Sequence, residues 1–399
     1  MSPPSVGAAA KGRPEPVVQS LRDLPEGTAP EGLEPAAPIL LEQNWTGDRG
    51  EASREPRPAR PRAVHAVFSK SGEATSVGAK ILIVKLSSLG DVVHAMPALQ
   101  DIRKALPQAQ IDWVVERGFA PLVRRCDGVH RVIECELRRW RQSPFSAATR
   151  GEWRAFKQNL QQESYDAVID LQGLTKSALV SRLARLAPQG RRYGLAAASE
   201  GSSFEAPARW LVDVAVTLPT HIDAETRSRE LCAKALGYAL PATKSYGLRS
   251  SAATTSQVAL VHGSSRADKL WPLASWQALG QRLNEQGYDV ALPHGSDTEE
   301  AMAQRIAGAI GRAQVWPRLG LDALTDALGG CAGVVGVDSG LSHIAVALDL
   351  PHVQIYNFDT AWRTGPQNAA RQCCVFAQPT PSLDAVWQAW LAVCGASRP

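Results

Sequence analysis

The chain has 399 residues, of which 44% are hydrophobic and 21% charged. That composition is typical of globular proteins, and the length favours two domains over one. The net charge of +4 suits an acidic partner but is too small to indicate nucleic-acid binding. The sequence also lacks an aromatic RNA-binding signature and the Cys/His spacing of zinc fingers, so we expect no nucleic-acid partner.

Membrane, secretion and metal signals are absent from the sequence. No stretch approaches the roughly 20 apolar residues that span a bilayer, and the first residues lack the hydrophobic core of a secretory signal. The seven cysteines have no CxxC spacing, and the adjacent Cys373 and Cys374 lack a second ligand pair. We therefore expect a cytoplasmic protein with free thiols, no metal site and no cofactor.

Residues 1–78 differ from the rest of the chain. They are rich in Pro, Ala, Glu, Arg and Gly and show no period of 2 or 3.6 residues. Such a segment buries too little apolar surface to offset its chain entropy. We expect a disordered extension without a catalytic role, either made in the cell or created by the choice of start codon.

The stretch Lys80–Leu99 predicts a strand, a tight turn and a helix. Ile81–Val84 is an apolar run, Ser87–Asp91 is polar, and a helical pattern follows. Gly90 allows the tight turn, and Asp91 stands at the N-terminus of the helix. Two interpretations remain open at this point: the carboxylate caps the helix, or it belongs to a site at the end of the strand.

Strands and helices continue to alternate, which predicts mostly parallel sheets covered on both faces. The composition turns polar around Pro241–Thr255 before a second series begins. We therefore expect an α/β protein with two Rossmann-like domains, residues 79–248 and 249–399, that face a central cleft. The final helix, Leu383–Val393, is a candidate to pack back on the first domain. The expected strands are Ile81–Val84, Ile111–Val115, Arg131–Ile133, Ala167–Asp170, Val258–Val261, Val290–Pro293, Val334–Val337 and Val353–Tyr356. The expected helices after residue 170 are Leu174–Leu186, Leu273–Gln286, Thr298–Ile310, Leu321–Leu328 and Leu341–Leu348.

Four polar or glycine-containing loops follow expected strands. They are Ser87–Asp91, Leu171–Ser177, His262–Pro272 and Val337–His343. Because the carboxyl ends of parallel strands meet at one edge of a sheet, these loops point to a shared cleft.

The loop VDSGLSH is the most specific of the four. Gly340 lets the backbone approach a ligand, and the helix that begins there offers N–H groups and a dipole suited to phosphate. Asp338 would repel phosphate, so it fits better as an acceptor for ligand hydroxyls or as a partner of His343. The alternative for His343 is an ordinary helix residue.

The loop HGSSRADKLWP supplies Ser264, Ser265, Arg266 and Lys269, groups that suit a diphosphate. A solvated loop is the alternative. After the next strand, Glu299 and its neighbours are natural partners for ribose hydroxyls or an adenine edge.

A basic and aromatic segment lies in the first domain. It contains Arg138, Arg139, Trp140, Arg141, Trp153, Arg154, Phe156 and Lys157. Interleaved cations and aromatic rings suit an acidic glycolipid or an anionic membrane surface. The alternative is a charged helix with two core tryptophans.

Several motifs are missing. There is no GxGxxG after the first strand, which disfavours a dinucleotide oxidoreductase, and no GxxxxGK[ST], which excludes a P-loop kinase. No DxD pair stands at a strand end, so a metal-bridged nucleotide-sugar site is not expected.

Six ordered motifs nevertheless match a known family. KILIVKLSSLGDVVHAMPAL, WVVERGFA, LRRWR with FS, YDAVIDLQGLTKSA, DKLWP and VDSGLSH resemble the ADP-heptose-using glycosyltransferases of glycosyltransferase family 9. The resemblance runs from Lys80 to the C-terminal helix and implies the two-domain GT-B fold. It also implies metal-independent, inverting transfer of L-glycero-D-manno-heptose from ADP-heptose to the first Kdo of Kdo2-lipid A. An enzyme with that acceptor would lie on the cytoplasmic face of the inner membrane, in peripheral contact with it.

The resemblance also assigns site residues. It implies that Asp91 is the general base and that Lys269 neutralises the diphosphate leaving group. The implied donor-binding residues are Ser264, Ser265, Lys269, Glu299, Leu319, Asp338, Ser339, Gly340 and His343. The implied acceptor-binding residues are Ser88, Arg138, Arg139, Arg141 and Gln172.

This sequence departs from the family pattern at a few positions. Serines replace threonines in HGSS and VDSG, Gln142 stands where a lysine can occur, and the loop after Tyr356 lacks the expected glycine–proline pair. SSLGDVVH and LRRWR favour the enzyme that adds the first heptose over one that adds a later core sugar. A non-catalytic nucleotide-sugar or glycolipid binding protein is the alternative from another class.

Overall fold

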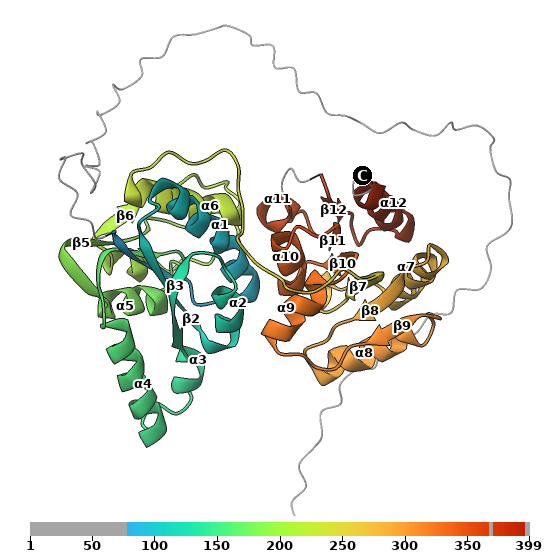
Figure 1. Cartoon of the computed structure of the whole chain (residues 1–399), viewed down its shortest axis with the longest axis horizontal. Helices are drawn as coiled ribbons and strands as arrows, with labels where there is room; N and C mark the ends of the chain where they lie inside the picture. Colours follow the sequence, from blue (N-terminus) through green and yellow to red (C-terminus); the bar gives the residue numbers. More distant parts are fainter. Residues whose placement is uncertain (1–77, 367–369, 396–399) are drawn as a thin grey trace, which may run out of the picture. The chain divides into compact units, whose positions relative to one another are not determined.

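The computed structural model describes residues 78–366 and 370–395. The prediction of a disordered extension over residues 1–78 lies outside these residues, apart from Gly78. Two parallel sheets of six strands each form in the described part of the chain, and helices cover them (Figure 1). The α/β architecture with two Rossmann-like halves is therefore confirmed.

The first sheet has the strand order β3-β2-β1-β4-β5-β6. Its strands are β1 (Lys80–Val84), β2 (Gln110–Glu116), β3 (Val129–Cys135), β4 (Ser164–Asp170), β5 (Arg185–Leu195) and β6 (Val214–Val216). Its helices are α1 (Leu89–Ala105), α2 (Ala120–Arg124), α3 (Leu137–Trp140), α4 (Ala147–Leu160), α5 (Thr175–Leu183) and α6 (Ala224–Leu236), with short 3₁₀ turns η1 (Arg117–Phe119) and η2 (Ala206–Trp210).

The second sheet has the strand order β12-β11-β10-β7-β8-β9. Its strands are β7 (Gln257–Val261), β8 (Asp289–Leu292), β9 (Ala313–Val315), β10 (Gly333–Val337), β11 (His352–Tyr356) and β12 (Gln372–Phe376). Its helices are α7 (Leu273–Glu285), α8 (Asp297–Ala307), α9 (Leu321–Gly329), α10 (Gly340–Ala347), α11 (Ala361–Thr364) and α12 (Leu383–Gly395), with the 3₁₀ turn η3 (Ala267–Lys269).

The central strand β1 explains why the first sheet is covered on both faces. Ile81 and Ile83 pack on the side of α1, whereas Leu82 and Val84 pack on the other side with Trp140. All four aliphatic side chains are fully buried, so this strand reads as a continuous apolar run. Burial on both faces fixes where β1 ends, and hence where the loop Ser87–Asp91 begins.

The two halves meet where α1 packs against α10. A Cβ added to Gly340 would lie 2.9 Å from Cβ of Leu89 and 2.7 Å from its Cδ2. One added to Gly90 would lie 2.6 Å from Cδ2 of His343. Glycine at these two positions lets the N-termini of both helices approach each other closely.

The structure corrects the prediction for the last helix. Helix α12 packs on β11, β12 and α7 of its own half, not on the first domain. Val386, Trp390 and Val393 are buried and recur along one face of the helix, and this stripe joins the core of the second half. Gly333 leaves room for the Trp390 ring, since an added Cβ would lie 2.6 Å from it.

Other differences concern strands that the pattern did not reveal. Strand β5 contains Pro188, Gly190 and several arginines, and its pairing with β4 shifts register between Tyr165 and Ala167. The helix expected over Leu174–Leu186 therefore ends early, at Leu183. Strands β6, β9 and β12 were also missed. The first two have only three residues, too few to show a period.

Candidate active site

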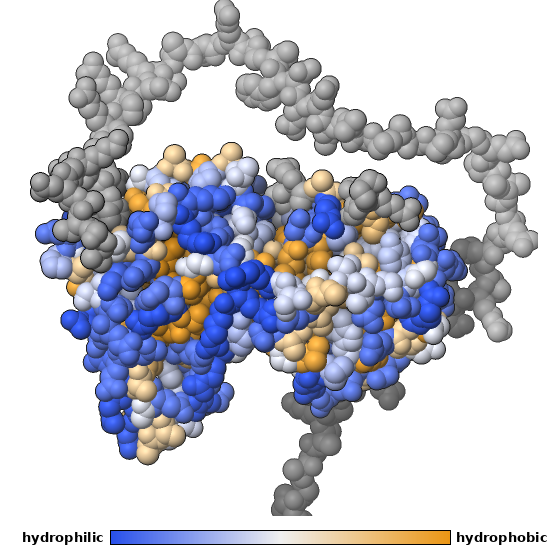
Figure 2. Space-filling view, in the orientation of Figure 1, coloured by the Kyte–Doolittle hydropathy of each residue, from blue (hydrophilic) through white to orange (hydrophobic). Residues whose placement is uncertain are grey.

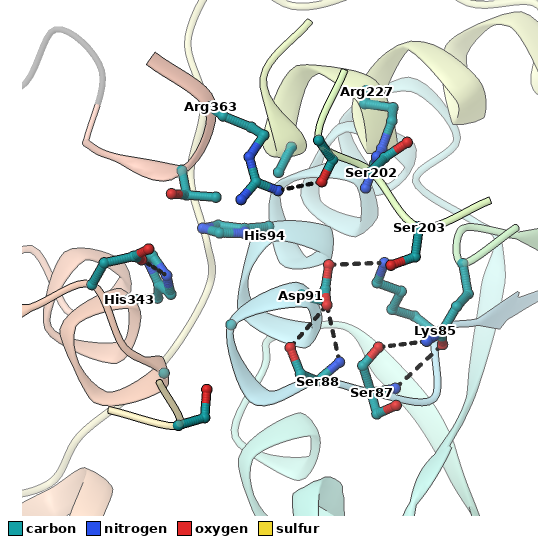
Figure 3. Close-up of a pocket in the computed structure, with 18 of the residues that line it drawn as sticks. Lys85, Ser87, Ser88, Asp91, His94, Ser202, Ser203, Arg227, His343 and Arg363 are labelled. Atoms are coloured by element: carbon teal, nitrogen blue, oxygen red, sulfur yellow. Dashed lines mark hydrogen bonds and ion pairs between the residues drawn. The ribbon is translucent and has the colours of Figure 1, made fainter. Parts of the chain in front are cut away.

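A cavity of about 430 Å³ lies at the carboxyl ends of strands from both sheets, and Figure 3 shows many of its residues. Residues from all four predicted loops line it, with Gln172, Leu174 and Lys176 coming from the loop Leu171–Ser177. Its walls carry six cations and two carboxylates: Lys85, Arg138, Lys176, Arg227, Lys269, Arg363, Asp91 and Asp338. This excess of positive charge suits a ligand with several negative charges.

Asp91 both closes the helix terminus and faces the cavity, so the two interpretations of this residue are compatible. The backbone N–H and the Oγ of Ser88 donate to its Oδ2 at 3.0 and 2.8 Å. Its Oδ1 lies 3.4 Å from Nζ of Lys85. About 40% of the side chain remains exposed, and this part is available to a ligand.

The electrostatic surroundings keep Asp91 ionised. Burial raises the pKa of its carboxyl, but the positive charge of Lys85 and the two hydrogen bonds from Ser88 outweigh this effect. The resulting pKa lies well below the ordinary value of an aspartate. Asp91 is therefore a carboxylate at any physiological pH.

Lys85 was not predicted as a site residue. Its side chain is 3% exposed, and its Nζ also donates to the carbonyl of Leu171 at 3.2 Å. Burial lowers the pKa of this lysine, and Asp91 opposes the shift. A lysine directly after a buried strand is the signal that could have drawn attention to it.

The second half contributes an ion-pair network at the start of α10. Nζ of Lys269 lies 2.5 Å from Oδ2 of Asp338, and Nε2 of His343 lies 3.4 Å from Oδ1 of the same carboxylate. The Oγ of Ser264 donates to the backbone carbonyl of Asp338 at 3.1 Å. Burial raises the pKa of Asp338, but the hydrogen bonds and charges of His343 and Lys269 lower it by more. This carboxyl is therefore also ionised. The structure thus brings four predicted donor-site residues together.

Ser339 marks a place for an anion. It is the N-cap residue of α10, and its Oγ is buried without a hydrogen-bond partner among the described residues. The first N–H groups of a helix lack partners within the helix and carry partial positive charge. An unpaired hydroxyl beside such N–H groups fits a bound phosphate oxygen.

Two histidines connect the halves across the cavity. The ring of His94, one turn after Asp91 on α1, lies 4.3 Å from the ring of His343 on α10. Burial and the neighbouring His343 lower the pKa of His94 well below the ordinary histidine value. His94 is therefore neutral and packs beside His343, which pairs with Asp338, without adding a second positive charge.

The predicted acceptor residues separate into two groups. Ser88, Arg138 and Gln172 line the cavity. Arg138 donates to the Oγ of Ser87 at 3.4 Å, and Gln172 braces the same loop through both ends of its amide. Because three hydrogen bonds of its amide go to Leu86 and Ser87, Gln172 shapes the loop more than it offers contacts to a ligand.

Arg139 and Arg141 do not line the cavity. Arg139 forms ion pairs with Glu136 and Glu152, and Arg141 is exposed. The buried Trp140 separates them in the sequence. Only one of the two tryptophans in the segment is a core residue, because Trp153 remains 37% exposed.

Three predicted donor residues also lie outside this cavity. Ser264 is adjacent to it through its bond to Asp338. Glu299 accepts a hydrogen bond from the backbone N–H of Gly295 at 2.7 Å, which closes the turn before α8. Leu319 packs against the hydrophobic core.

Two arginines in the cavity were missed by the sequence analysis. Arg227 of α6 is buried and donates to the Oγ of Ser199 at 3.2 Å, and burial lowers its pKa. Arg363 of α11 lies in the segment after β11 that departs from the family pattern, and it donates to the carbonyl of Gly201 at 2.7 Å. It thereby links the second half to the first, as Figure 3 shows.

Comparison with known proteins agrees with this arrangement. The family model of glycosyltransferase family 9 (heptosyltransferase) matches residues 153–387. The chain belongs to this family. Lipopolysaccharide heptosyltransferase 1 of Pseudomonas aeruginosa is 40% identical over 283 residues, which cover 69% of this chain and 78% of the relative. Lipopolysaccharide heptosyltransferase 2 of Escherichia coli is 27% identical over 295 residues, which cover 69% and 82%.

A solved structure supports the family membership. E. coli heptosyltransferase WaaC with ADP matches with a TM-score of 0.71 and 36% identity, covering 77% of this chain and 98% of that one. The GT-B fold and the glycosyltransferase class of the enzyme are therefore confirmed. In the described ranges, no helix is long and apolar enough to cross a membrane.

Proposed function

We propose that this family 9 enzyme transfers L-glycero-D-manno-heptose from ADP-heptose to the first Kdo of Kdo2-lipid A, during assembly of the lipopolysaccharide inner core. The observation that carries the proposal is the cavity whose walls bring Asp91 and the Lys269–Asp338 pair together with five further cations. Its positive charge suits both a diphosphate donor and a carboxylate-bearing acceptor.

The donor diphosphate would bind at the start of α10. The unpaired Oγ of Ser339, the first N–H groups of the helix and the Nζ of Lys269 would surround the phosphate oxygens. Asp338 and His343 would hold Lys269 in place and accept hydrogen bonds from sugar hydroxyls. By the family resemblance, Glu299 and Leu319 would contact the ribose and the adenine.

Asp91 would act as the base. A hydroxyl of the first Kdo donates a hydrogen bond to Oδ1 or Oδ2, and its oxygen attacks C1 of the heptose opposite the diphosphate. The new C1–O bond forms while the old C1–O bond breaks, its electron pair leaves with ADP, and the proton moves to Asp91. The attack from the opposite face inverts the anomeric centre.

The low pKa of Asp91 is compatible with this role. A carboxylate is too weak a base to remove the proton of a free hydroxyl, but the hydroxyl becomes acidic as its oxygen bonds to C1. Proton transfer would therefore follow C–O bond formation. Lys269 would stabilise the negative charge that develops on the leaving diphosphate.

The acceptor would enter from the side of the first half. Arg138, at the cavity wall, would pair with a Kdo carboxylate or a lipid phosphate. Arg141 and Arg139 would reach phosphates outside the cavity, and Ser88 and Gln172 would shape the loop beside the reacting hydroxyl. A lipid acceptor places the enzyme on the cytoplasmic face of the inner membrane, in peripheral contact with it.

The experiment is a transfer assay with purified enzyme and ADP-heptose. Kdo2-lipid A and an acceptor that already bears one heptose are offered separately, and the anomeric configuration of the product is read by NMR. We expect transfer to Kdo2-lipid A with inversion. Exclusive use of the heptose-bearing acceptor would instead assign the enzyme to the addition of a later core sugar.

A further inference from the structure

Helices α3 and α4 form a hairpin, residues 137–160, that the transfer mechanism uses only at one end. Figure 1 shows α4 extending away from the sheet of its half. Trp140, Trp153 and Phe156 pack on one another with ring centroids 5.6–5.7 Å apart, and the indole N–H of Trp140 donates to Glu152 at 2.7 Å. The hairpin is therefore an ordered element.

A bare aromatic ring stands at the turn of the hairpin. Phe145 is 85% exposed, more than any other large hydrophobic side chain of the described residues. The guanidinium of Arg150 donates to the backbone carbonyl of Phe145 at 2.6 Å. The Oγ of Ser146 caps α4 by accepting from the N–H of Thr149 at 3.0 Å. These hydrogen bonds hold the backbone around Phe145 in a position that leaves its ring exposed to solvent.

The same segment concentrates positive charge. Between residues 137 and 157 there are six Lys and Arg side chains and a single carboxylate, Glu152, which is already paired with Arg139. Arg150, Arg154 and Lys157 are exposed and recur at helical spacing along one side of α4. In Figure 2, moderately hydrophobic residues lie at the free end of this projection, with hydrophilic residues around them.

The hairpin is directly connected to the candidate active site. Arg138, on α3, lines the cavity and contacts Ser87 in the loop that presents Asp91. Trp140, two residues later, anchors α4 through Glu152. Whatever the hairpin tip binds is therefore held at a fixed position relative to the cavity.

We propose that the α3–α4 hairpin docks the enzyme on an anionic phospholipid bilayer, with the Phe145 ring in the interface and Arg150, Arg154 and Lys157 against the headgroups. This inference rests on the proposed function, because it gives that function's lipid acceptor a surface from which to enter the cavity. Exposed aromatic rings partition into the bilayer interface, and cations near an anionic surface strengthen binding about five-fold each.

Other occupants fit less well. A second copy of the chain would bring the same positive stripe and would be repelled. A nucleic-acid duplex would satisfy the cations but would gain little from Phe145, because its bases are already stacked on one another, and the sequence has no aromatic RNA-binding signature. The combination of an immobilised apolar tip and flanking cations therefore favours the bilayer.

The test measures binding of the full chain to vesicles by co-sedimentation, with phosphatidylcholine alone and with added phosphatidylglycerol. Phe145→Ser should weaken binding to the anionic vesicles about ten-fold, the amount expected for one interfacial aromatic ring. Its control is Phe376→Ser, which removes an exposed phenylalanine of the second half, 43% exposed, and should bind like the wild type.

A second pair of variants tests the charge. Arg154→Gln with Lys157→Gln should weaken binding to anionic vesicles by about 25-fold and leave binding to neutral vesicles unchanged. Lys104→Gln with Arg305→Gln removes two exposed cations elsewhere and should have little effect. Equal binding of Phe145→Ser and wild type, or equal binding of the wild type to neutral and anionic vesicles, would overturn the proposal.

An activity measurement separates this proposal from the proposed function. Phe145→Ser should lose transfer to acceptor embedded in vesicles but keep wild-type transfer to the same acceptor after its acyl chains are removed. Equal losses with both acceptors would count against docking and indicate a structural effect. A wild type that binds vesicles as expected but transfers heptose to neither acceptor would contradict the proposed function alone.

Discussion

Nζ of the buried Lys85 lies 3.4 Å from Oδ1 of Asp91, beside the N-terminus of the helix that presents this carboxylate. The lysine sits at the end of β1 and the aspartate in the first turn of α1. The pair therefore fixes both the position and the charge of the proposed base.

Replacement of this lysine should change the pH dependence of transfer. Lys85→Met removes the positive charge that lowers the pKa of Asp91, so that pKa should rise, and the acid limb of the kcat/KM profile should move up by about 1–3 pH units. The measurement is kcat/KM from pH 8.5 down to pH 3, the range in which the limb of Lys85→Met should appear while that of the wild type stays below it. The control is Lys80→Met, which breaks the ion pair between the first residue of β1 and Glu163, both about a third exposed, and should leave the limb in place. An unmoved limb in Lys85→Met would show that Lys85 does not govern Asp91.

Loss of Lys269 should affect the leaving group more than donor binding. Lys269→Met removes the cation 2.5 Å from Asp338 at the proposed diphosphate site, and kcat should fall about 10²–10³-fold. Steady-state kinetics with saturating acceptor will give kcat and the KM for ADP-heptose. A change confined to KM would assign Lys269 to ground-state binding only.

The close approach of the two helix N-termini predicts that Gly90 cannot be enlarged. In Gly90→Ala the new Cβ would meet the ring of His343, which is buried and held by Asp338 and His94. The ring or the helix must move, and we expect about a ten-fold loss in kcat/KM. Gly151→Ala, whose Cβ would meet nothing within 4 Å, is the matched control. Wild-type activity of Gly90→Ala would show that the N-termini separate freely.

A buried histidine should contribute stability that is lost in mild acid. Burial lowers the pKa of His352 to about 4, although its Nδ1 donates to the carbonyl of Val334 at 2.9 Å. Since the pKa is lower in the folded state, the stabilisation is complete above the unfolded value of about 6.5 and is lost as pH falls toward 4. Asp170, whose pKa burial raises to about 6, changes stability in the opposite direction.

The difference between wild type and His352→Asn isolates this effect, because Asn can still donate to Val334. From pH 7 to pH 5, the wild type should lose about 2 kcal/mol more of its free energy of unfolding than the variant. Urea denaturation at the two pH values measures it. Parallel losses would show that His352 keeps an ordinary pKa in the folded protein.

The sequence located those site residues whose position is set by neighbouring residues. Asp91, Asp338 and Ser339 each follow a buried strand and stand at a helix start, so a short stretch of chain is enough to place them. Lys85 could not be placed in this way, because its position depends on a hydrogen bond to the carbonyl of Leu171, which is distant in sequence. Its burial could not be inferred from the local pattern.

The remaining misses have the same cause. Arg227 and Arg229 lie two residues apart on α6, yet only the first lines the cavity, because the second pairs with the buried Asp101. Nothing local distinguishes them. The last helix was expected to pack back on the first domain, because the groove beside Gly333 that receives Trp390 in the second half exists only in the folded sheet.

The central claim is that Asp91 is the base of heptosyl transfer. Asp91→Asn keeps an oxygen that accepts from Ser88 and removes the basic group, while Asp384→Asn on the surface of α12 is the control. The decisive measurement combines single-turnover transfer to Kdo2-lipid A with the Kd for ADP-heptose. We predict that Asp91→Asn transfers about 10³-fold more slowly and binds ADP-heptose within about two-fold of the wild type. Transfer at the wild-type rate would contradict the mechanism.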